Sequence, residues 1–79
     1  MSLLTSRQRE ILIQMRDAEE SYYGELVYEH GCAYLGWTRV APRTVFALLR
    51  LCAISADPYS SGAFGRYHIN DTGRSLIAS

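Results

Sequence analysis

The hydrophobic positions of this chain recur at helical spacing over most of its length and alternate only near its end, which predicts helices followed by strands. The clearest helix lies in the stretch 38–54, TRVAPRTVFALLRLCAI. Four apolar residues have the i, i+3, i+4, i+7 spacing of a core-facing stripe, namely Val45, Leu48, Leu49 and Cys52. Pro42 suits the first turn of a helix, because the N–H that proline lacks would have no partner within the helix at that position. We therefore expect a helix that starts near Pro42 and buries this stripe, including the Cys52 thiol.

The opposite face of this helix bears two arginines. Arg43, Ala47 and Arg50 fall there at helical spacing, so their side chains are expected to point away from the core. This Arg-bearing face is the surface that the helix offers to a partner.

Two shorter helical signals precede this one. Thr5 and Gln8 have the spacing of a capping box, which predicts a helix over residues 6–17. The expected inner face of that helix consists of Ile11, Leu12, Met15 and Ala18. Ser21 suits the N-cap of a second helix over residues 22–30. The apolar segment 32–37, CAYLGW, is then expected to be an aromatic connector that fills the space between helices.

The last third of the chain predicts two strands and a final helix. A short strand is expected at 53–56, and the alternating segment 66–70 predicts a half-buried second strand. The segment between them, 57–65, is rich in turn-forming residues, so the two strands should form an antiparallel hairpin. Asn70 or Asp71 can cap a short helix at the end of the chain.

Three segments resemble parts of the winged helix-turn-helix repressors. Residues 4–12, LTSRQREIL, resemble the first helix of bacterial and phage winged-helix repressors, including the SOS repressor. Residues 43–54, RTVFALLRLCAI, resemble a recognition helix that runs into the first wing strand. Residues 66–78, RYHINDTGRSLIA, resemble the second wing strand and following helix of the multiple-antibiotic-resistance repressors. The resemblance implies a mainly α, α+β fold: three helices, a two-stranded β-hairpin wing and a short C-terminal helix, in a single domain over residues 1–79.

The same resemblance implies a function in transcription regulation. In that family the recognition helix enters the major groove of double-stranded DNA and the wing contacts the backbone. Arginine suits both contacts, because it can bind guanine edges or phosphates. When the family's contact positions are carried over to this sequence, and Arg39 just before the helix is added, the predicted contact residues are Arg39, Arg43, Thr44, Ala47, Arg50, Ser60, Ser61 and Arg66.

The charge distribution keeps a second interpretation open. The net charge is zero, whereas a lone DNA-binding domain is usually basic. Residues 1–29 contain three arginines and six carboxylates, and residues 30–79 contain five arginines and two carboxylates. The chain is therefore polarised, with its positive half centred on the predicted third helix.

The alternative function is protein binding. A small, neutral winged helix suits a phage-encoded inhibitor of a host complex, for example an anti-CRISPR protein. Six tyrosines, two phenylalanines and one tryptophan are also more aromatic residues than so small a core is expected to hold. The aromatic residues that the core does not hold would form a surface patch suited to a protein partner or to a homodimer.

Enzymatic chemistry has little support in the sequence. Cys32, Cys52, His30 and His68 are residue types that bind zinc, but they lack paired CxxC or HxxxH spacing. The sequence contains no nucleophile elbow and no phosphate-binding glycine loop. Its apolar runs are all shorter than the roughly 18 residues of a membrane span. We therefore expect a cytoplasmic protein with reduced cysteines that is not an enzyme and binds no cofactor or metal.

Overall fold

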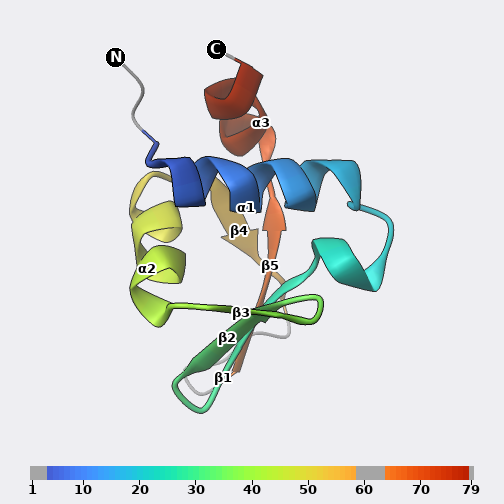
Figure 1. Cartoon of the computed structure of the whole chain (residues 1–79), viewed down its shortest axis with the longest axis vertical. Coiled ribbons are helices and arrows are strands. Elements are labelled where there is room, and N and C mark those ends of the chain that lie inside the picture. Colours follow the sequence, from blue (N-terminus) through green and yellow to red (C-terminus); the bar gives the residue numbers. More distant parts are fainter. Residues whose placement is uncertain (1–3, 59–63, 79) are drawn as a thin grey trace.

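The computed structural model describes residues 4–58 and 64–78, which form three α-helices, one 3-10 helix and five strands (Figure 1). In chain order the elements are α1 (Ser6–Asp17), the 3-10 helix η1 (Tyr22–Gly24), β1 (Leu26–Glu29), β2 (Cys32–Leu35), β3 (Thr38–Val40), α2 (Pro42–Arg50), β4 (Ile54–Ala56), β5 (Phe64–Ile69) and α3 (Asp71–Ala78).

The five strands form one antiparallel sheet with the order β3-β2-β1-β5-β4. The turn between β1 and β2 consists of His30 and Gly31, whose φ values of 50° and 80° are typical of a type I′ hairpin. Gly36, with a φ of 60°, begins the next two-residue turn, between β2 and β3. Because β1 pairs with β5 as well as with β2, the centre of the sheet joins segments that are far apart in the sequence.

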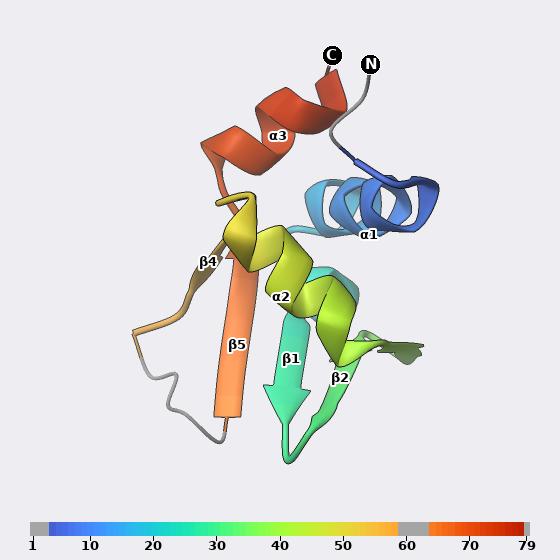
Figure 2. The ribbon, with the colours of Figure 1, turned by 90° about the vertical axis from the view of Figure 1, so that its left-hand side faces the viewer.

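The helices lie on one face of this sheet. Figure 2 looks onto that face, where α2 lies in front of β5, β1 and β2, and α1 and α3 lie around their upper ends. Strand side chains that point toward the helices are buried at alternate positions, namely Leu26, Ala33, Leu35, Val40, Ile54 and Ile69. They pack against buried side chains of α1 and α2 and form the core, so the other face of the sheet is left to solvent.

The predicted first helix is confirmed as α1. The hydroxyl of Thr5 accepts a hydrogen bond from the amide of Gln8 (3.1 Å), and the Gln8 side chain accepts one from the amide of Thr5 (3.0 Å), which completes the capping box. Three of the four predicted inner residues are buried: Ile11, Leu12 and Met15. Ala18 is instead the half-buried C-cap residue of the helix.

The predicted third helix is confirmed as α2, but it ends before Cys52. The amide of Cys52 donates to the carbonyl of Leu49 (3.0 Å) and the amide of Ala53 donates to that of Leu48 (3.0 Å), which is a Schellman turn. Cys52 occupies the left-handed position of this turn, with a φ of 58°, where glycine is usual. Its side chain is exposed, so the prediction of a buried Cys52 thiol is wrong, whereas Val45 and Leu48 of the same stripe are buried.

Replacing Cys52 by glycine is therefore expected to raise the free energy of unfolding by about 0.5–1 kcal/mol. The left-handed conformation strains a residue with a β-carbon by about 1 kcal/mol, and the greater freedom of glycine in the unfolded chain offsets part of the gain. Urea denaturation under reducing conditions measures the change. The matched variant Cys52→Ala removes the thiol but keeps the strain, so it should leave stability nearly unchanged; an equal gain in both variants would contradict this explanation.

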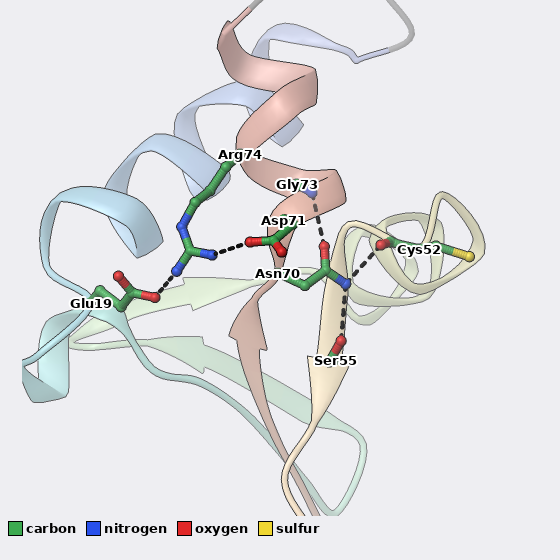
Figure 3. A network of polar contacts seen from close by, with 7 residues as sticks. All are labelled: Glu19, Cys52, Ser55, Asn70, Asp71, Gly73 and Arg74. Carbon is green, nitrogen blue, oxygen red and sulfur yellow. Dashed lines mark hydrogen bonds and ion pairs between the residues drawn. The ribbon is translucent and has the colours of Figure 1, made fainter.

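Asn70 connects α3 to the rest of the molecule (Figure 3). Its side-chain oxygen accepts a hydrogen bond from the amide of Gly73 (2.8 Å), which makes it the N-cap residue of α3. Its side-chain nitrogen donates to the carbonyl of Cys52 (2.8 Å) and to the hydroxyl of Ser55 (2.9 Å). Of the two predicted caps, Asn70 and Asp71, the structure selects Asn70, because Asp71 is already the first residue of the helix.

A surface ion pair also links α3 to the turn after α1. Arg74 binds Asp71 within α3 (3.2 Å) and the carboxylate of Glu19 (Figure 3). Arg74 is half-buried and both carboxylates are exposed, so the contacts orient α3 without contributing much to stability.

The predicted fold class, a mainly α winged helix-turn-helix, is wrong. The protein is a small α+β domain with three α-helices and a five-stranded antiparallel sheet. Residues 22–30 contain η1 and β1 instead of a second helix, and residues 32–37 contain β2 and a turn instead of a connector. The predicted hairpin is confirmed as β4 and β5, but β5 also pairs with β1 and is therefore not part of a free two-stranded wing.

The physical reason is that residues 26–35 suit a hairpin better than a helix. CAYL alternates between more exposed and buried positions, and LVYE runs from the buried Leu26 to the exposed Glu29, on either side of the turn residues His30 and Gly31. Both turn residues adopt positive φ, which an α-helix does not allow. On the side of β1 that does not face β2, β5 supplies the hydrogen-bond partners of the backbone.

Candidate partner-binding surface

The solvent-facing side of α2 brings together three of the predicted contact residues and one that was not predicted. Arg43, Ala47 and Arg50 lie along this side, as their spacing indicates, with both arginines exposed. Phe46 lies between them in sequence and is 48% exposed. We refer to these four residues as the α2 face.

Phe46 is held in place although half of it is in solvent. Its ring packs against that of Tyr28 on β1, with 5.7 Å between the ring centroids and a tilt of 58°. Tilted aromatic pairs of this kind contribute roughly 0.5–1.5 kcal/mol beyond the burial of their surface. Phe46 is thus an apolar side chain held against the sheet at the edge of the α2 face.

The two arginines of the α2 face are not engaged by carboxylates. In residues 4–58 and 64–78, four other arginines have acidic partners: Arg7 with Glu10, Arg16 with Asp17, Arg66 with Glu25, and Arg74 with Asp71 and Glu19. Within the same part of the chain, Arg43 and Arg50 have no hydrogen bond from their guanidinium groups and no ion pair. Their positive charge is therefore available to a partner.

The remaining predicted contact residues do not join this surface. Thr44 is half-buried at the start of α2. Arg39 lies on β3, where its guanidinium donates to the sulfur of Cys32 (3.8 Å) and its carbonyl accepts from the side chain of Arg7 (3.5 Å). Arg66, the predicted wing contact, lies within β5 and faces away from the helices, on the other side of the sheet from the α2 face. Ser60 and Ser61, the predicted wing tip, lie outside the described residues.

Sequence reasoning missed Phe46, although a signal for it was present. Phe46 comes three residues after Arg43 and four before Arg50, which places it on the same side of a helix as both arginines. The predicted core-facing stripe and the predicted contact residues both left it out. Only the arrangement of α2 over the strands shows that part of its ring stays in solvent.

Among the described residues, no three His, Cys, Asp or Glu side chains come close enough together to hold a metal ion. None of the helices in that part of the chain is long and apolar enough to cross a membrane.

Comparison of the chain with protein-family models, with curated proteins and with solved structures finds no match.

Proposed function

We propose that this chain is a protein-binding module, acting in the cytoplasm, that docks its α2 face on an acidic surface of a partner protein. The observation that carries the proposal is Phe46, half-exposed and packed on Tyr28, flanked by two arginines without acidic partners among the described residues. An inhibitor of a host complex is a role that such a module can fill, because binding alone is enough to block an interface.

The residue types of the α2 face are those that dominate protein interfaces. Aromatic residues and arginine are enriched at the centres of interfaces, where few residues contribute most of the binding energy. Arg43 and Arg50 are seven residues apart, so they are separated by about 10 Å along the helix axis. We expect two carboxylates of the partner at a similar separation, with an apolar pocket for Phe46 between them.

Double-stranded DNA, the partner favoured by the sequence, stays an untested prediction. Three observations favour protein instead. The net charge is zero. Residues 22–30 do not supply the helix that crosses the DNA backbone in a helix-turn-helix. Finally, a half-exposed phenylalanine, Phe46, is part of the surface that would face the groove.

Site-specific photo-crosslinking tests the proposal. A photoreactive phenylalanine analogue at position 46 is expected to give a discrete protein adduct in cells that express the chain, and mass spectrometry identifies the partner. The same analogue at Ser75, an exposed residue of α3, is the matched control and should not give that adduct. The adduct should disappear when Arg43 and Arg50 are both replaced by alanine.

With the purified partner, Phe46→Ala is expected to weaken binding at least about 30-fold, the effect of losing a residue at the centre of an interface. Arg43→Ala and Arg50→Ala should each weaken it about tenfold, and Ser75→Ala should leave it unchanged. Isothermal titration calorimetry measures these affinities. The proposal is wrong if the purified chain shifts a 30-base-pair duplex at physiological salt and loses that shift in the double arginine variant, since the α2 face would then bind DNA.

A further inference from the structure

The second prominent surface is a groove on the face of the sheet opposite the helices. Its floor follows from the strand register: Val27 on β1 lies between Tyr34 on β2 and Arg66 on β5, and Glu29 lies beside Phe64. All these side chains line one hollow of about 480 Å³. We refer to it as the sheet groove. It is separate from the α2 face, because α2 packs on the other side of the same strands.

Aromatic side chains form the wall of the sheet groove at the turn between β2 and β3. Trp37 is 80% exposed, and its indole nitrogen donates a hydrogen bond to the hydroxyl of Tyr23 (3.2 Å). Gly36 packs directly on Tyr23 and has a φ of 60°, so a larger residue there would displace the turn. Tyr34, 42% exposed, continues the aromatic surface along β2. The indole is thus positioned by the turn and by Tyr23, with most of its surface open to a ligand.

The charge available in the sheet groove is negative. Arg66 contacts the carboxylate of Glu25 (3.8 Å), so these two charges largely offset each other. Among the described residues, the carboxylate of Glu29 lies 3.6 Å from Nε2 of the neighbouring His30, and both side chains are mostly exposed. The Glu29 carboxylate can therefore form an ion pair with a cationic group of a ligand, next to the apolar surface of Val27 and Phe64.

We infer that the sheet groove binds an extended peptide segment in which a basic side chain alternates with an apolar one. Alternate residues of an extended chain are about 6.7 Å apart, which is also the spacing of Val27 and Glu29 along β1. A basic side chain can therefore reach Glu29 while the next side chain on the same face contacts Val27 and Tyr34. The aromatic wall adds contacts to the hydrocarbon stem of arginine or lysine and to the cation itself.

A titration with two capped five-residue peptides tests the inference, one alternating leucine with arginine and the other leucine with glutamate. Trp37 is the single tryptophan of the chain, so its fluorescence reports binding at the groove directly. The basic peptide should change the emission with a saturable curve and should shift the amide NMR signals of Val27, Tyr34 and Gly36. The signals of Arg43 and Arg50 should stay in place, which separates this site from the α2 face.

Glu29→Gln is expected to weaken binding of the basic peptide about tenfold, because a charge-assisted hydrogen bond becomes a neutral one. Glu10→Gln, the same change at an exposed carboxylate of α1, should leave the affinity unaltered. Equal binding of both peptides, or equal effects of the two variants, would show that no basic side chain is recognised. Signal shifts that grow with protein concentration in the absence of peptide would instead mean that the groove is occupied by a second copy of the chain. Either outcome overturns the inference.

Discussion

Replacing Gly73 by alanine is expected to lower the free energy of unfolding by about 2–3 kcal/mol, although alanine is the better helix former by about 1 kcal/mol. Gly73 lies in the first turn of α3 and is buried against the start of β4. A β-carbon there would overlap the carbonyl oxygen of Ala53 and come within 2.8 Å of Cγ1 of Ile69. The carbonyl of Ala53 cannot retreat freely, because it accepts the amide hydrogen bond of Asn70 (3.3 Å).

Urea denaturation followed by circular dichroism measures this loss. Ser75→Ala is the matched control, because Ser75 is an exposed residue of the same helix and should show only the small gain from helix propensity. If Gly73→Ala also stabilised the protein, the close approach of α3 to Ala53 would be contradicted.

Replacing Asn70 by alanine is expected to cost about 2–3 kcal/mol, the second large effect. The side chain makes three hydrogen bonds at once, to the amide of Gly73, the carbonyl of Cys52 and the hydroxyl of Ser55. An N-cap contributes about 1 kcal/mol, and each of the other two bonds about 0.5–1.5 kcal/mol. Their loss frees the start of α3 from the end of α2 and from β4.

Asn70→Ser separates these contributions. Serine can still cap α3 through its hydroxyl, but it has no nitrogen that reaches Cys52 and Ser55, so it should recover about 1 kcal/mol relative to alanine. Hydrogen exchange should locate the effect, with faster exchange of α3 amides in Asn70→Ala than in Asn70→Ser. Equal stabilities of the two variants would mean that Asn70 does not cap the helix.

The elements that were predicted correctly depend on interactions between residues close in sequence. The capping box of Thr5 and Gln8, the amphipathic spacing of α2 and the N-cap at Asn70 all act within one or two helical turns. The hairpin of β4 and β5 likewise joins neighbouring segments across a turn. Such signals act over a few residues, so the sequence shows them without knowledge of the rest of the fold.

Residues 22–35 were predicted wrongly because their conformation depends on distant partners. The stretch YYGELVYEHGCAYL is short, apolar and compatible with either helix or strand. The alternation of CAYL after His30 and Gly31 was a usable signal for a strand, but β1 completes its hydrogen bonds with β5, near the other end of the chain. Because β1 pairs with β5, the protein has a five-stranded sheet and not the predicted helices with a two-stranded wing.

The residues of the candidate sites also fall into two groups, those placed by local sequence pattern and those placed by tertiary packing. The sequence by itself determined that Arg43, Ala47 and Arg50 share one side of a helix, because helical periodicity is a local property. Only the tertiary structure decided that Phe46 joins them in solvent and that Arg66 faces the opposite side of the molecule. The reason is that the side of a sheet on which a residue lies follows from strand register, and the exposure of a helix face follows from what packs against it.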